Sequence, residues 1–252
     1  MIYPKNRTLK GGYMIKINEI FGPTIQGEGK SAGKEVIFLR LAGCNLRCRW
    51  CDTPYTWNWI GTKFQHPDKY DPKKEIVSLT PWQVFWRILP GPRMITNLVI
   101  SGGEPLLQQS QLIPLLQIFK RYGWWIEVET NGTIVPTDEF LSLVDQINCS
   151  PKTSNSGEDN PSEKRERPEA LRKLVSSPKV YFKFVVVDMK DILEIQSLVN
   201  KYEMKQVYLM AEGKTREEQL TKEKEVESVA QLFGWLFSPR LQVLKWGNKR
   251  GV

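Results

Sequence analysis

The chain has 252 residues, of which 40% are hydrophobic and 25% charged, a composition typical of a globular protein rather than a disordered one. No apolar run approaches the roughly 18 residues of a membrane span, and the first residues lack the apolar core of a secretory signal, so we expect a cytoplasmic protein. The formal net charge is +8, but the basic residues are scattered, which favours a solvated surface over a nucleic-acid groove.

Residues 1–13 read as an N-terminal extension before a second possible start at Met14. From there the pattern alternates strands with helices. The first half predicts strands over 35–41, 97–101 and 124–129, and helices that begin at Thr80-Pro81 and that span 106–122. Pro114 should kink or divide the second of these helices.

The second half of the chain continues this alternation. It predicts helices over 138–146, 192–202 and from a Thr215/Glu218 capping box to about 233, and strands over 180–187, 206–210 and 241–246. The polar stretch 153–173, which contains two prolines, reads as an inserted loop without a function of its own.

Strands that alternate with helices predict an α/β fold with a mostly parallel sheet. About six such units are too few for an eightfold barrel, so we expect a partial (open) β/α barrel of about six strands. We expect residues 14–252 to form a single domain that includes the polar insert. Functional loops should lie at the carboxyl ends of the strands.

Three of the four cysteines lie within eight residues, in the sequence CNLRCRWC that begins at Cys44. Three thiolates on one loop can bind three irons of a [4Fe–4S] cluster and leave the fourth iron open. Two alternatives remain: a structural zinc site with Cys149 as the fourth ligand, or ordinary buried thiols. Zinc ribbons generally use two separated pairs, and core thiols would not be concentrated beside two arginines.

The chain contains one histidine, His66, in a polar stretch where a loop position is the default interpretation. A single histidine argues against Ser-His-Asp triads, His-rich zinc hydrolases and His-ligated haem.

The cysteine loop resembles that of the radical S-adenosylmethionine (SAM) superfamily, which carries it after the first barrel strand. Two further segments support the resemblance, because SGGEP at 101–105 and ETNG at 129–132 also follow predicted strands and are similar to superfamily motifs. The resemblance implies that the amino and carboxylate groups of SAM chelate the open iron. It also places Trp50 near the adenine.

Other motifs resemble the 7-carboxy-7-deazaguanine synthase family over most of residues 14–252: IQGEG at 25–29, Arg40, Cys51-Asp52-Thr53, Ser150-Pro151-Lys152 and GNKRG at 247–251. This resemblance implies a lyase of queuosine-type deazapurine biosynthesis. In that family a SAM-derived radical starts the conversion of 6-carboxy-5,6,7,8-tetrahydropterin to 7-carboxy-7-deazaguanine, with loss of ammonia.

The resemblance also implies roles for individual residues, with the radical chemistry carried by SAM rather than by a catalytic side chain. The metal ligands would be Cys44, Cys48 and Cys51 for the cluster and Thr53 for a Mg²⁺ ion, which prefers oxygen. The substrate contacts would be Ile25, Gln26, Gly27, Arg40 and Ser101, with arginine suited to a carboxylate. The SAM contacts would be Trp50, Cys51, Asp52, Gly103, Ser150, Pro151 and Lys152.

The family further implies a flavodoxin or ferredoxin as electron donor and a homodimer, with no membrane and no nucleic acid required. Three residues depart from its pattern. Cys149 is not needed by the three-cysteine motif and is expected to be a core thiol. Ala211 stands where the family has proline. Gln242 stands where relatives often have histidine, and it can hydrogen-bond but cannot titrate near neutrality.

Two other functions stay open on the sequence. A different radical SAM reaction, such as that of a glycyl-radical activase, would keep the cysteines and the Gly-Gly-Glu segment but would not need IQGEG, Arg40 and Thr53 together. A zinc module that binds nucleic acid predicts bound zinc and salt-sensitive binding, but the long β/α pattern argues against it.

Overall fold

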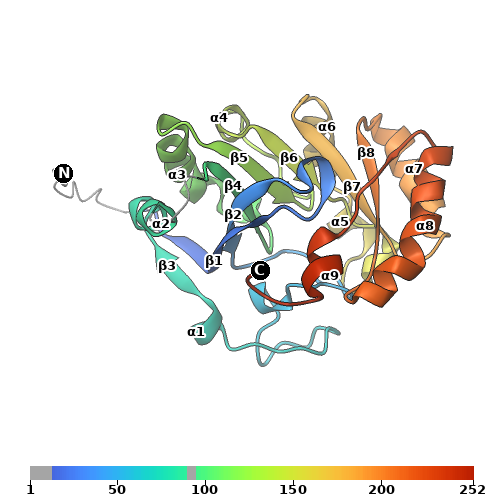
Figure 1. The fold of residues 1–252 in the computed structure, drawn as a ribbon, viewed down its shortest axis with the longest axis horizontal. Coiled ribbons are helices and arrows are strands. Elements are labelled where there is room, and N and C mark those ends of the chain that lie inside the picture. The colour runs from blue at the N-terminus through green and yellow to red at the C-terminus, as the bar shows by residue number, and fades with distance from the viewer. Residues whose placement is uncertain (1–12, 90–94) are drawn as a thin grey trace.

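The computed structural model describes residues 13–89 and 95–252. These residues form a curved nine-stranded sheet in the order β3-β1-β2-β4-β5-β6-β7-β8-β9, with helices along its outer side (Figure 1). The strands are β1 (Ile15–Ile25), β2 (Glu35–Leu41), β3 (Val77–Leu79), β4 (Asn97–Gly102), β5 (Trp125–Thr130), β6 (Gln146–Cys149), β7 (Val180–Val186), β8 (Val207–Ala211) and β9 (Leu236–Phe237).

Helices connect these strands. They are α1 (Pro72–Glu75), α2 (Pro81–Ile88), α3 (Gln109–Arg121), α4 (Asp138–Leu143), α5 (Ser162–Arg165), α6 (Pro168–Val175), α7 (Asp191–Tyr202), α8 (Arg216–Leu232) and α9 (Leu241–Trp246). Four short 3-10 turns accompany them: η1 (Gly29–Ser31), η2 (Pro54–Thr56), η3 (Pro105–Gln108) and η4 (Ser154–Ser156). None of the helices in the described ranges has the length and apolar character that crossing a bilayer requires.

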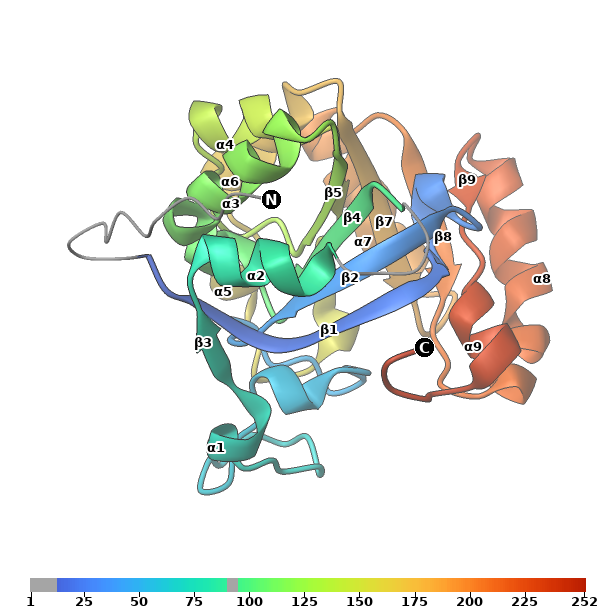
Figure 2. The same cartoon turned by 60° about the vertical axis from the view of Figure 1, so that its left-hand side comes forward.

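The expected partial barrel is confirmed. Strands β2, β4, β5, β6, β7 and β8 pair in parallel, each with the next, and β9 continues the sheet beside β8. Strand β1 runs antiparallel to β2 and carries β3 on its other edge, so it crosses the front of the barrel in Figure 2. The parallel strands therefore direct their carboxyl ends, and the loops that follow, to the same end of the barrel.

Side chains alternate between the two faces of these strands, and the two faces differ in chemistry. On β5, Ile126 and Val128 belong to the hydrophobic core, which fills the space beneath the outer helices. Glu127 and Glu129 point the other way, toward the barrel interior. Strand β7 repeats this arrangement, with Phe182 and Phe184 in the core and Lys183 inside the barrel. The barrel interior is therefore polar, and its charges need partners.

Two predictions about local structure are wrong. Residues 241–246 form helix α9 rather than a strand, because a short apolar run fits either element and tertiary contacts decide between them. The polar stretch 153–173 is not simply a loop, since it contains η4, α5 and α6. Helix α6 buries Ala170, Leu171 and Leu174, spaced as one face of a helix.

The other differences concern element boundaries. Helix α3 runs through Pro114 without interruption, and the helix expected over 138–146 ends at Leu143, where the chain turns into β6. Strands β1, β3, β6 and β9 were not anticipated. The expected N-terminal extension lies outside the described residues apart from Tyr13. The single-domain organisation of 14–252 stays a prediction.

Candidate active site

A cavity of about 400 Å³ opens at the carboxyl ends of the parallel strands. Every residue that the sequence analysis assigned to a site lines this cavity except Pro151. Segments as distant in sequence as 25–27, 40–53, 101–103 and 150–152 therefore meet around one space. The structure brings the expected residues together.

The cysteine loop leaves the end of β2 and gives each thiol a hydrogen-bond donor. Leu46 N lies 3.4 Å from the sulfur of Cys44, and the indole nitrogen of Trp57 lies 3.3 Å from that of Cys51. The sulfur of Cys48 faces the Nδ2 atom of Asn160 at 3.6 Å. Donors directed at sulfur are typical of thiolates that ligate iron, whose negative charge they stabilise.

Burial raises the pKa of all three thiols. The pKa of Cys48 rises to about 12, and those of Cys44 and Cys51 also lie above the ordinary range, with neighbouring negative charge adding to the effect of burial. Three adjacent thiolates in so buried a place need a compensating positive charge. Iron ions supply that charge, so the residues present fit a cluster held by the three cysteines.

The zinc alternative does not fit this geometry. Nowhere in the described residues, which include all four cysteines, do three Cys, His, Asp or Glu side chains gather closely enough to hold one metal ion. Cys149 is fully buried in the hydrophobic core beneath Gly132 and does not line the cavity. It is the core thiol that the sequence predicts. A cubane cluster differs from a zinc ion because each thiolate binds a separate iron.

Backbone hydrogen bonds hold the loop after β4 against the cysteine loop. Gly103 N donates to the carbonyl of Leu41 at 3.1 Å, and Glu104 N donates to that of Gly43 at 2.8 Å. A Cβ atom at position 103 would lie 2.9 Å from Cys44 N, so a side chain there would push the loops apart. Glycine at 103 therefore permits the contact that sets the position of the first cysteine.

The carboxyl group of Glu104 serves the fold rather than the cavity, which it does not line. It is fully buried and accepts hydrogen bonds from Thr130 Oγ1 at 2.8 Å and from Asn131 N at 2.6 Å. It thereby joins the loops that follow β4 and β5. Of the two residues, Gly103 is the one that faces the space where SAM is expected.

Arg40 lies opposite the cysteines, near the end of β2. Its Nε donates to Glu19 of β1 at 2.7 Å, and Tyr55 and Arg250 also donate to that carboxylate. Among the described residues, the Arg40 side chain forms hydrogen bonds through Nε alone. The other edge of its guanidinium group therefore remains suited to an anionic ligand.

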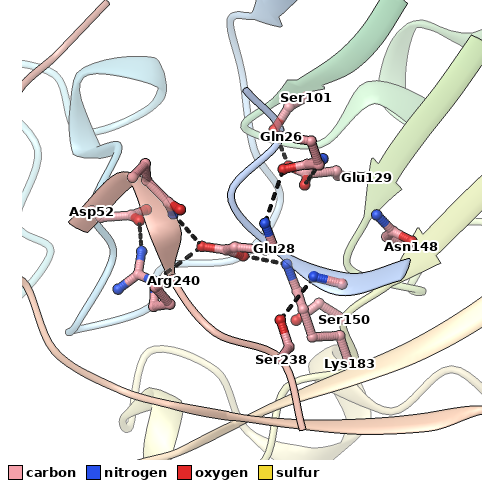
Figure 3. A network of polar contacts seen from close by, with 12 residues as sticks. Gln26, Glu28, Asp52, Ser101, Glu129, Asn148, Ser150, Lys183, Ser238 and Arg240 are labelled. Carbon is pink, nitrogen blue, oxygen red and sulfur yellow. Dashed lines mark hydrogen bonds and ion pairs between the residues drawn. The ribbon is translucent and has the colours of Figure 1, made fainter. Parts of the chain in front are cut away.

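A second group of polar residues lies inside the barrel beside Arg40. Gln26 donates through Nε2 to Glu127 at 2.6 Å and to Glu129 at 3.2 Å, and Ser101 donates to Glu129 at 2.6 Å (Figure 3). Asn148 and Gln146 also donate to Glu127. Burial and the nearby charge of Glu129 raise the pKa of Glu127 from 4.5 to about 7.

A third group centres on Glu28, which pairs with Lys183 and Arg240 (Figure 3). Arg240 extends the pairing to Asp52 at 2.5 Å, and Gln242 donates to Glu28 at 2.5 Å. Burial alone would raise the pKa of Glu28, but the two cations hold it well below its usual range. The buried charges are thus compensated within the cavity wall.

Comparisons with known proteins agree with this geometry. Residues 39–186 match the radical SAM superfamily. The chain is 32% identical to the 7-carboxy-7-deazaguanine synthase of Pyrobaculum aerophilum, over 94% of this chain and 97% of that protein. It is 29% identical to the synthase of Bacillus subtilis, over 94% of this chain and 98% of that one.

The chain belongs to the 7-carboxy-7-deazaguanine synthase family of the radical SAM superfamily. The crystal structure of QueE from Escherichia coli has the same fold, with a TM-score of 0.68 and 22% identity over 93% of this chain and 98% of that one. The partial barrel is therefore shared with that structure.

Sequence reasoning missed two charged residues of the cavity wall, Lys183 and Arg240, and the fully buried Glu127 inside the barrel. One signal was present. Lys183 stands alone in the apolar run VYFKFVV, and Glu127 occupies an alternate position of β5; a charge amid strand residues marks a face that is not hydrophobic core. No comparable signal identified Arg240, which lies just before an element predicted wrongly.

We predict that Glu127 makes the folded protein less stable as pH rises. Its pKa is raised in the folded state, so the folded protein holds a proton that the unfolded chain loses between pH 4.5 and about 7. A shift of this size corresponds to about 3 kcal/mol. Urea unfolding of the cluster-free protein at pH 5 and pH 7.5 should show that loss, and Glu127→Gln should remove most of it.

Glu225→Gln, at an exposed position of α8, serves as the control and should keep the parent's pH dependence. An unchanged pH dependence in Glu127→Gln would show that this carboxyl group is already ionised at pH 5.

Proposed function

We propose that this protein converts 6-carboxy-5,6,7,8-tetrahydropterin to 7-carboxy-7-deazaguanine, with loss of ammonia, using a [4Fe–4S] cluster and SAM. One observation carries the proposal: the three-cysteine loop and the wall formed by Gln26, Arg40 and Ser101 line the same cavity. A SAM molecule bound at the cysteines would thus face a substrate bound at that wall.

When bound, the cluster would supply the electron for reductive cleavage of SAM and so the radical chemistry of the reaction. The chain's own task is to hold both molecules in the correct relative position and to exclude water. Cys44, Cys48 and Cys51 hold the cluster. The short backbone contacts between the loops that follow β2 and β4 fix where that cluster stands.

The SAM side of the cavity is preformed by Trp50 and the segment after β6. The indole nitrogen of Trp50 donates to the carbonyl of Asn155 at 3.1 Å, which fixes the ring plane. Lys152 lies 5.5 Å from the ring centre and donates to Ser150 Oγ at 2.7 Å. This arrangement offers an aromatic face to an adenine, and a hydroxyl and a cation to polar groups of SAM.

The substrate side offers groups that match a carboxylated pterin. Arg40 supplies a cation for the carboxylate. Gln26 and Ser101 are held in fixed orientations by Glu129, so they are pre-organised for the donor and acceptor edge of the ring. Gln242 also lines the cavity, and the hydrogen bond from its Nε2 to Glu28 holds its amide in place.

The deciding experiment is an anaerobic assay of the iron-reconstituted protein with SAM, reductant, Mg²⁺ and the pterin, read by mass spectrometry. We expect 7-carboxy-7-deazaguanine from the parent and a loss of more than a thousandfold in Cys48→Ala. The matched control is Cys149→Ala, which should retain its iron and its activity because that thiol lies in the core.

Each other outcome is informative. SAM cleavage without 7-carboxy-7-deazaguanine would refute the proposed substrate and leave another radical SAM reaction in its place. Protein that carries zinc and never cleaves SAM would refute the cluster.

We also propose that Mg²⁺ binds at Thr53 together with oxygen atoms of the substrate. Thr53 lines the cavity beside the third cysteine, with its Oγ1 3.7 Å from the sulfur of Cys51. Mg²⁺ usually keeps several waters and takes few protein ligands, so a hydroxyl can be one of its oxygen ligands. Two observations support this magnesium site: the family resemblance and the position of Thr53 in the cavity.

We predict that Thr53→Val raises the Mg²⁺ concentration needed for half-maximal activity about tenfold or more, because the variant keeps the shape but loses the oxygen ligand. A magnesium titration of the turnover rate measures this effect. Thr221→Val, at an exposed position of α8, is the control. An identical magnesium response in Thr53→Val and the parent would remove Thr53 from the metal site.

The remaining proposals concern partners and place. The formal net charge of +8 suits an acidic flavodoxin or ferredoxin as electron donor, and turnover driven by flavodoxin should then fall steeply with ionic strength.

We propose a homodimer that works in the reducing cytoplasm, where its four free cysteines persist. Sedimentation equilibrium at the monomer mass across micromolar concentrations would refute the dimer.

A further inference from the structure

The segment 153–160, to which the sequence analysis gave no role, covers the cysteine loop. Arg49 N donates to the carbonyl of Ser156 at 2.9 Å, and Arg47 N donates to Oδ1 of Asn160 at 2.7 Å. The indole of Trp50 donates to Asn155. Three residues of the cysteine loop, Arg47, Arg49 and Trp50, therefore form hydrogen bonds with a single segment that lies more than 100 positions later in the chain.

The segment is itself anchored to the far side of the barrel. Asn155 donates through Nδ2 to Asp191 at 2.8 Å and to the carbonyl of Val185 at 3.0 Å. Ser154 donates to Glu194 of α7 through both its backbone nitrogen and its hydroxyl. Because α7 packs on the core, these contacts give the segment a rigid support, and it can hold the cysteine loop in one position.

Asn160 is the member of the segment that reaches a thiol. Its side chain is buried, with 2% exposure. Its Oδ1 accepts from Arg47 N, and its Nδ2 lies 3.6 Å from the sulfur of Cys48. The first contact fixes the orientation of the amide, because a backbone N–H requires the oxygen to face it. The NH₂ group must then face the sulfur.

A donor at a cysteine sulfur affects a cluster in a definite direction. The partial positive charge of the N–H group favours the reduced state, which carries one more electron, so hydrogen bonds to cluster sulfurs raise the reduction potential. Among the described residues, Asn160 donates the hydrogen bond to the Cys48 sulfur. Leu46 N and the Trp57 indole, which are near in the chain, donate to Cys44 and Cys51, and Asn131 Nδ2 lies 4.0 Å from the Cys44 sulfur.

We propose that Asn160 is a positioning residue that holds the cysteine loop and raises the reduction potential of the cluster through Cys48. This inference rests on the proposed cluster but not on the identity of the substrate. It gives the segment 153–160 a function: the segment makes the cluster easier to reduce by a weak cellular donor.

The test compares reduction potentials of the full-length, iron-reconstituted protein and its variants, by redox titration followed by electron paramagnetic resonance. Asn160→Asp keeps an oxygen for Arg47 N but replaces the donor with a negative oxygen. We expect its one-electron reduction equilibrium to weaken at least tenfold, which is about 59 mV, with unchanged iron content. Asn160→Ala also loses the loop contact and should in addition lose iron faster to a chelator.

Asn200→Asp, at an exposed position of α7, adds the same charge away from the cluster and should leave the potential unchanged. If Asn160→Asp does not fold, judged by circular dichroism, Asn160→Ser removes the same amide donor with less disturbance and should shift the potential in the same direction. A potential equal to the parent's in the folded Asn160 variants, or an equal shift in Asn200→Asp, would overturn the inference.

The substrate assignment is tested separately, because the titration contains no pterin. A parent that forms no 7-carboxy-7-deazaguanine but shows the expected shift in Asn160→Asp refutes the proposed function and supports this inference. A parent that forms the product while Asn160→Asp keeps its potential refutes only the inference.

Discussion

The site depends on one constraint: the interior of the open barrel is lined by charged side chains, which must be paired with one another because little water reaches them. Glu28 meets this need by accepting from both Lys183 and Arg240. Those residues come from β7 and from the chain just before α9, so one carboxylate joins two distant parts of the fold. Pairing of this kind fixes the cavity wall before any ligand arrives.

The cysteine loop also needs its negative charge compensated, but the hydrogen-bond donors that reach its sulfurs are uncharged groups. One buried and two half-buried thiols are costly as thiolates, so iron must compensate their charge and the protein must hold the loop ready for it. Gly103 allows the loop after β4 to approach from one side, and the segment 153–160 contacts it from another. Gly103 and the buried Asn160 therefore both help to place the three sulfurs around a cluster.

Sequence alone predicted the parallel barrel, the cysteine loop and the placing of three motifs at strand ends, because these features are local or follow from strand direction. It missed the contacts of segment 153–160, since polar composition suggests solvent exposure and does not reveal that Asn160 is buried against a distant thiol. It also assigned 241–246 to a strand. The docking of Leu241 N on the carbonyl of Gly27 is a tertiary contact that no local pattern records.

The misassigned helix explains a departure from the family pattern. Gln242 stands at the start of α9 and donates to Glu28, a carboxylate that its two cations keep ionised. That contact orients the amide, so its Oε1 lies against Gly27, where a Cβ atom would come within 2.6 Å of the amide carbon. Gly27 and Gln242 are thus matched in size. Because an amide does not titrate, the contact between Gln242 and Glu28 stays the same at every physiological pH.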